Sequence, residues 1–129
     1  GGDWATHMIE HELSGMFDVA HGAGLSAIWG SWARHVLPLR PDRFALFAER
    51  VMGVAPAETE TITGLRGIEA MERFFRSLHM PTSLKELNLA PTDAQIAEMA
   101  EEALVGKAHI GSVKKLLPPD IVAIFAASR

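Results

Sequence analysis

The sequence contains no cysteine. This absence excludes disulfide bonds and metal sites built from thiolates, and it suits the reducing cytoplasm, where we expect the protein to reside. No apolar run reaches the roughly 18 residues that a membrane-spanning helix needs, and no signal-peptide pattern opens the chain. The chain has 12 Lys and Arg against 16 Asp and Glu, a formal net charge of −4, without a basic run. We therefore expect neither nucleic acid nor a membrane as a partner.

Strand patterns and nucleotide-binding loops are missing as well. No segment alternates apolar and polar residues as a half-buried strand does, and no repeat or low-complexity tract occurs. No glycine-rich phosphate loop follows a strand, so the chain carries no dinucleotide-binding domain of its own. The chain starts at Gly1 without an initiator Met, which is typical of a piece of a longer protein. Its 129 residues suffice for one domain with a sizeable core.

What the sequence does contain is helical periodicity almost throughout. In the first helix Ile9, Leu13 and Met16 form an apolar stripe, while polar residues, among them His11 and Ser14, form another about half a turn away. The pattern predicts an all-α domain, a compact bundle of five to seven helices. The first helix keeps its spacing through Phe17, and a second apolar stripe begins at Leu25. A third helix is expected from Pro41 to Gly53, and a fourth that stops before Pro81. A capping box at Thr92 and Gln95 opens a fifth helix, and the last helix starts at Pro118.

Three histidines near the start are the most informative residues present. His7 and His11 are four residues apart, so on a helix both rings project from one face. His21 would lie about 21 Å from His7 along one unbroken helix. Ligands of one metal ion must each come within about 2 Å of it. His7 and His21 can therefore share a metal only if the chain turns back between them.

The sequence permits such a turn. Two glycines, Gly22 and Gly24, loosen the backbone between the first helix and the second apolar stripe. We expect a helix, a tight bend and a second helix with His21 at its mouth, where Gly22 lets another backbone or a cofactor approach closely. The remaining histidines show no partner pattern and are expected at surface or capping positions: His35, His79 and His109.

A competing motif overlaps the same residues. The stretch HMIEH at residues 7–11 matches H-x-x-E-H, the inverted zinc-protease signature, in which both histidines bind zinc and the glutamate is the general base. In this alternative Glu10 is the base and Glu86 the further ligand. Such enzymes use a larger α/β domain, however, and the motif leaves His21 and Gly22 unexplained.

Two stretches resemble the iron-containing, or group III, alcohol dehydrogenases, in the branch of the NAD(P)H-dependent butanol dehydrogenases. They read DWATHMIEHELS at residues 3–14 and HGAGLSAI at residues 21–28. Weaker likeness continues to residues 119–122, so the resemblance spans nearly the whole chain but only the last third of such an enzyme. It implies the C-terminal domain of a dehydroquinate synthase-like fold. Residues 1–129 would then be an all-helical metal-binding domain, with the nucleotide-binding domain outside this chain.

The resemblance also implies roles for individual residues. His7 and His21 match two metal ligands that the family's helical domain supplies. His11 matches a histidine that faces the cleft beside nicotinamide and substrate, so we expect it to be catalytic and to contact the cofactor, with Gly22 as a second cofactor contact. The family's other two ligands, an aspartate and a histidine four residues later, lie upstream of Gly1.

These roles predict an oxidoreductase. Imidazole ligands leave Fe²⁺ or Zn²⁺ Lewis acidic, so the ion can polarise the oxygen of a small alcohol or aldehyde during hydride transfer to or from NAD(P)H. His11 could relay the proton. The chain is then the metal-binding, catalytic-cleft half of an alcohol dehydrogenase, inactive by itself. The alternative is a stand-alone helical binding or assembly module with incidental histidines. An uncovered apolar face would favour a homodimer or a domain-exchanged oligomer.

Overall fold

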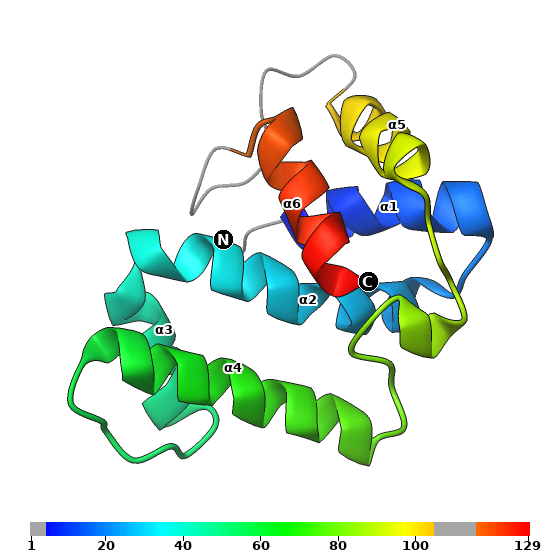
Figure 1. Cartoon of the computed structure of the whole chain (residues 1–129). Coiled ribbons are helices and arrows are strands. Elements are labelled where there is room, and N and C mark those ends of the chain that lie inside the picture. Colours follow the sequence, from blue (N-terminus) through cyan, green and yellow to red (C-terminus); the bar gives the residue numbers. More distant parts are fainter. Residues whose placement is uncertain (1–4, 105–115) are drawn as a thin grey trace.

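The protein is a helical bundle in the computed structural model, which describes residues 5–104 and 116–129, with side chains from Met8 onward (Figure 1). Within these ranges there is no β-strand element, and the expectation of an all-α bundle with five to seven helices is confirmed. The elements are α1 (Ala5–Phe17), α2 (His21–Val36), η1 (Leu37–Leu39), α3 (Pro41–Arg50), α4 (Glu60–Ser77), η2 (Lys85–Leu87), α5 (Asp93–Ala103) and α6 (Pro118–Ser128).

Helix α2 lies in the middle of the bundle. It packs against α1 and α6 on one side and against α4 on the other (Figure 1). Helix α5 completes the first group through its contacts with α1 and α6, and α3 lies along α4. The first and second helices, which carry the histidines, are therefore held by packing on several sides.

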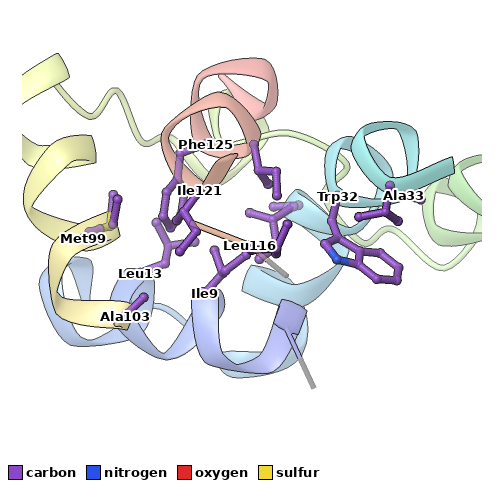
Figure 2. Close-up of a cluster of buried hydrophobic side chains, with 14 of the residues drawn as sticks. Ile9, Leu13, Trp32, Ala33, Met99, Ala103, Leu116, Ile121 and Phe125 are labelled. Carbon is purple, nitrogen blue, oxygen red and sulfur yellow. The ribbon is translucent and has the colours of Figure 1, made fainter. Parts of the chain in front are cut away.

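A cluster of buried apolar side chains lies where α1, α5 and α6 meet (Figure 2). Ile9 and Leu13 of α1 are fully buried there, as are Met99 and Phe125. Met16, the third residue of the predicted apolar stripe, is only partly buried and packs on the edge of the core. Burial of this stripe stabilises the bundle, because each fully buried large apolar side chain contributes about 1.5–3 kcal/mol. The core face of α1 is thus the one that its periodicity predicts.

Several helix ends follow local sequence chemistry. The hydroxyl of Thr92 accepts the backbone N–H of Gln95, and the Gln95 side chain accepts the N–H of Thr92, so the predicted capping box is present. Helix α3 ends at Arg50 rather than at Gly53. Gly53 instead takes a positive φ of 67° in the turn that follows, a conformation that costs glycine little.

The second helix starts at His21, the residue expected at its mouth, four residues before its apolar stripe begins at Leu25. Gly22 and Gly24 therefore lie inside its first turn. The bend itself occupies only residues 18–20, and Asp18 makes the reversal with a positive φ of 53°. An aspartate tolerates this left-handed conformation better than most residues. The expected arrangement of helix, tight bend and helix is present, with a shorter bend.

Among the helices that the structure describes, none combines the length and the apolar character needed to cross a bilayer.

Candidate functional site

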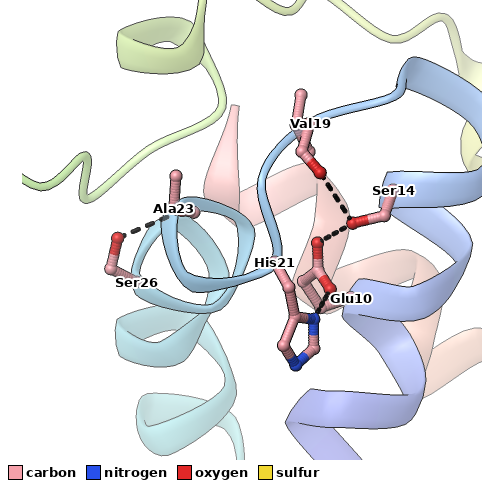
Figure 3. A network of polar contacts seen from close by, with 6 residues as sticks. All are labelled: Glu10, Ser14, Val19, His21, Ala23 and Ser26. Carbon is pink, nitrogen blue, oxygen red and sulfur yellow. Dashed lines mark hydrogen bonds and ion pairs between the residues drawn. The ribbon is translucent and has the colours of Figure 1, made fainter.

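The bend between α1 and α2 brings together three polar side chains, those of Glu10, Ser14 and His21 (Figure 3). Helix α1 closes with the Asp18 N–H donating to the Ser14 carbonyl at 2.8 Å. Ala20 then serves as the N-cap residue of α2 in an extended conformation, without a side-chain hydrogen bond. This reversal places His21 beside the middle of α1, next to Glu10 and His11.

Glu10 is the buried centre of this group. Its exposed fraction is 0 %, and its two carboxylate oxygens have different partners. Oε2 accepts from His21 Nδ1, and Oε1 accepts from the Ser14 hydroxyl (Figure 3). The Ser14 hydroxyl also lies 3.1 Å from the Val19 carbonyl oxygen, and its single proton serves one of these acceptors at a time. A buried carboxylate needs such partners, because its desolvation is costly.

His21 faces outward from this buried carboxylate. Its side chain is 42 % exposed, and Nε2 points away from Glu10 (Figure 3). With Nδ1–H donating to Glu10, the lone pair of the neutral ring is on Nε2. Nε2 is therefore the atom of His21 that would bind a metal ion.

His11 lies beside His21 on the exposed side of the bend. The two ring centroids are 5.2 Å apart, and the ring planes are tilted by 46°. The structure thus brings together two of the three predicted histidines. The side chain of His7, the third, lies outside the described residues, and its role as a ligand stays a prediction.

The close approach expected at Gly22 occurs at Gly24. A Cβ at Gly24 would overlap the carboxylate of Glu10, whereas a Cβ at Gly22 would meet no atom within 4 Å. Gly24 is buried and Gly22 is exposed. The expectation that Gly22 lets another part of this chain approach closely is therefore wrong. Its role beside a cofactor is untested and stays a prediction.

The sequence pattern assigned Glu10 a role only as the general base of the peptidase alternative and did not predict its contact with His21. The available signal was its position, three residues before Leu13 and seven before Phe17, which places a carboxylate at the edge of the apolar stripe. The burial of Glu10 also opposes the peptidase alternative, because a general base must reach a water molecule. Glu86, the further ligand of that alternative, accepts a hydrogen bond from Thr82 at 3.0 Å. Among the described residues, no three His, Cys, Asp or Glu side chains cluster as a complete metal site.

The other histidines have mixed outcomes. His79 is exposed just after α4, with a positive φ of 60°, as expected of a surface or capping residue. His35, expected at a surface or capping position, is half-buried, and its Nε2 lies 2.9 Å from Asp120 Oδ1, a partner that the sequence pattern did not show. This pair joins α2 to the first turn of α6, across 85 residues, a separation that a local pattern does not reveal. His109 lies outside the described residues.

The fit to a metal site is favourable at His21. A histidine that binds a metal characteristically donates its other ring N–H to a carboxylate or carbonyl oxygen, and His21 makes this contact with Glu10. A merely solvated histidine has no need of a fully buried carboxylate. The donor chemistry therefore agrees with a divalent ion that imidazole suits, such as Fe²⁺ or Zn²⁺.

Comparisons with known proteins identify the family that this chain resembles. The model of the Fe-containing alcohol dehydrogenase family, C-terminal, matches residues 1–129. The chain is 35% identical over 128 residues to the probable NADH-dependent butanol dehydrogenase 1 of Bacillus subtilis (strain 168), covering 98% of this chain and 32% of that protein. It is 27% identical over 129 residues to the NADH-dependent butanol dehydrogenase A of Clostridium acetobutylicum, covering 97% of this chain and 32% of that protein.

The fold agrees with a solved structure as well. The NADH-dependent butanol dehydrogenase A of Thermotoga maritima superposes with a TM-score of 0.86 at 29% sequence identity, covering 99% of this chain and 33% of that one. The chain thus spans about a third of the length of the relatives that it matches.

Proposed function

Because this chain belongs to the Fe-containing alcohol dehydrogenase family, as its C-terminal domain, we propose that it forms the metal-binding, catalytic-cleft half of a NAD(P)-dependent alcohol or aldehyde oxidoreductase. Residues 1–129 are one all-helical metal-binding domain in this proposal, and the nucleotide-binding domain lies outside the chain. The substrate is a small primary alcohol or aldehyde. The names of the similar proteins from Bacillus and Clostridium, both butanol dehydrogenases, support this class.

One observation carries the proposal: the ring of His21 contacts the buried carboxylate of Glu10 through Nδ1 and turns Nε2 outward, beside His11. His21 through Nε2 and His7 from the first turns of α1 would hold the ion. Ligands from outside the chain would complete the site, because structural and catalytic sites of this kind use three or four protein donors. The ion would be Fe²⁺ or Zn²⁺, and when bound it supplies Lewis acidity toward the substrate oxygen.

The chain's own residues have distinct tasks in this proposal. His11 is exposed and close to His21, so its ring is placed to pass a proton between the cleft and water. Gly22 at the start of α2 has open space around its Cα, which leaves room for the nicotinamide end of NAD(P)H. Packing of α1 against α2 holds the two helices in place, so the side chains that would line the cleft keep their positions.

Metal titration tests this proposal on the chain itself. Co²⁺ or Zn²⁺ should bind weakly to the wild type, because part of the ligand set is outside the chain. His21→Ala should abolish the binding seen by calorimetry, and oxidation of 1-butanol with NAD⁺ should be undetectable. Equal binding by wild type and His21→Ala contradicts the proposal, as does robust turnover. Loss on His11→Ala with full binding by His21→Ala favours the peptidase-like alternative.

A second candidate is a helical assembly module, and exposed apolar side chains favour it. Phe74 is 50% exposed and Leu78 is 54% exposed, and four residues apart they share one side at the end of α4. Uncovered apolar surface of this kind promotes association. We expect the isolated chain to form homodimers or domain-exchanged oligomers, and the pair of substitutions Phe74→Ser and Leu78→Ser to shift it toward the monomer in sedimentation velocity. A monomeric wild type would remove this candidate.

A further inference from the structure

We propose that Glu10 is a positioning residue: from its buried site it fixes both the tautomer and the orientation of His21, so that Nε2 faces the metal as a neutral donor. The inference rests on the proposed function, in which His21 is a ligand. Glu10 itself does not touch the ion or the substrate in this proposal. It acts through the imidazole ring alone.

The burial of Glu10 is the first argument. An ionised carboxylate at 0 % exposure is expensive to keep, and an apolar residue of similar volume often gives equal or better stability than a buried charged pair. The core of α1 around it is apolar, with Ile9 and Leu13 fully buried. Stability alone therefore does not explain a carboxylate at this position, because an apolar side chain would pack there as well.

The asymmetry of the pair is the second argument. The carboxylate is fully buried, while the His21 side chain is 42 % exposed. The contact thus anchors the inner nitrogen, Nδ1, and directs the outer one, Nε2, away from Glu10 (Figure 3). The ring of His11 lies beside that of His21. A pair that only joined two helices would gain nothing from this direction. For a ligand, however, the direction of the lone pair decides whether the metal can bind.

The fit of the carboxylate against α2 is the third argument. Gly24 leaves the space that the Glu10 carboxylate fills, since a Cβ there would overlap Oε1. Ser14 holds the same oxygen from α1. Helix α2 has no acidic residue in its first turn and no side-chain cap. The Glu10 carboxylate lies beside this turn, at the end of a helix that favours negative charge. Ser14, the space over Gly24 and the first turn of α2 thereby hold the Glu10 carboxylate in addition to its contact with His21.

A comparison of two buried glutamates provides the test. Glu10→Gln keeps the shape of the side chain but weakens its acceptor toward His21. Glu72→Gln is the matched control, because Glu72 is also a buried carboxylate lying over a glycine of α2, Gly30, but its partner is Arg34. Both variants should lose stability. Only Glu10→Gln should change His21.

The first readout needs no metal. Long-range ¹H–¹⁵N correlation spectra of the histidine rings, recorded at alkaline pH, report which nitrogen of a neutral ring carries the proton. We expect His21 to be protonated on Nδ1 in the wild type and in Glu72→Gln, and to shift toward Nε2 protonation in Glu10→Gln. A wild-type tautomer in Glu10→Gln overturns the inference.

The second readout is Co²⁺ affinity, followed by the visible absorption of the bound ion. Glu10→Gln should weaken binding by about 10- to 100-fold, the usual effect of removing a group that orients a ligand. Glu72→Gln should leave it unchanged. Equal losses in both variants, or no loss in either, overturn the positioning role. If Glu10→Gln fails to fold, Gly24→Ala, which displaces the same carboxylate, takes its place.

The two proposals fail in different ways. If His21→Ala binds Co²⁺ as the wild type does, the proposed function fails, and the positioning of a metal ligand fails with it. If His21→Ala loses binding but Glu10→Gln retains both the affinity and the wild-type tautomer, the proposed function stands and only the role of Glu10 is overturned.

Discussion

Gly22 and Gly24, two residues apart in the first turn of α2, have opposite surroundings. Gly24→Ala would force the Glu10 carboxylate to move, whereas Gly22→Ala would enter open space. Overpacking of this kind costs about 1–3 kcal/mol. Alanine at an open helical position is instead neutral or stabilises by up to about 1 kcal/mol relative to glycine. We expect urea unfolding to show a lower midpoint for Gly24→Ala and no loss for Gly22→Ala, and equal midpoints would contradict this account.

Single residues also show where sequence reasoning stops. A metal shared by His7 and His21 requires a bend between them, and the bend that the structure shows places the His11 and His21 rings 5.2 Å apart. The choice between Gly22 and Gly24, by contrast, depends on which α1 side chain faces α2. That information is tertiary. The burial of Glu10 was missed for the same reason, since a carboxylate at the edge of an apolar stripe is usually solvated.

At the scale of the element, α2 carries a second ion pair that ties it to α4. Arg34 donates to both oxygens of Glu72, with Nη1–Oε2 at 3.0 Å and Nη2–Oε1 at 2.5 Å. Gly30 leaves the space for this carboxylate, as Gly24 does for Glu10. The hydrogen bonds that Arg34 donates to the Glu72 carboxylate raise the pKa of Arg34 above its already high ordinary value. On the alkaline side the pair is therefore fully formed at every pH below the ordinary pKa of arginine.

Arg34→Ala should destabilise the protein by leaving Glu72 buried without its cation. We expect a loss of about 2 kcal/mol, below the 3–5 kcal/mol of a fully buried pair, because the Arg34 side chain is 41% exposed. Urea unfolding at pH 7 and pH 9 should give the same loss, since the raised pKa keeps Arg34 charged at both. Replacing Glu72 with Met in the Arg34→Ala background should recover part of it, and a further loss instead would refute the pairing.

Elements differ in how far their sequence defines them. The start of α5 was accessible, because its capping box joins Thr92 and Gln95, which are three positions apart. The expected position of His21 at the mouth of α2 is confirmed, although no side-chain cap marks this helix start. The His35–Asp120 pair, between helices distant in the chain, was missed. Local chemistry can be predicted, whereas contacts between elements require the fold.

At the scale of the whole molecule, the site depends on the core beneath it. Leu13 is fully buried where α1, α5 and α6 meet, three residues after Glu10 (Figure 2). Leu13→Ala should lower the free energy of unfolding by about 2–5 kcal/mol through lost burial and the cavity left behind. Met16→Ala, at a partly buried position of the same stripe, should cost less. Similar losses from both would mean that the core is not where the structure places it.

The bundle as a whole was predictable from periodicity, because the amphipathic stripes specify which face of each helix is buried. Its arrangement around α2 was not, since nothing in the stripes says which helix meets which. The candidate site stands between these cases. Its histidines follow from spacing and resemblance, while its buried carboxylate follows only from the packing of α1 on α2.

His21 is the first residue of a helix whose N-cap, Ala20, offers no side-chain hydrogen bond. Helix ends open more readily than helix middles, so this turn should fray at temperatures where the core is still intact. An ion bound there would leave early in a melt. In a heated cobalt-loaded sample we expect the visible colour to fade several degrees before the far-ultraviolet circular dichroism falls, and added cobalt to delay both by mass action. The first turn of α2 would thus release its ion before the rest of the bundle unfolds.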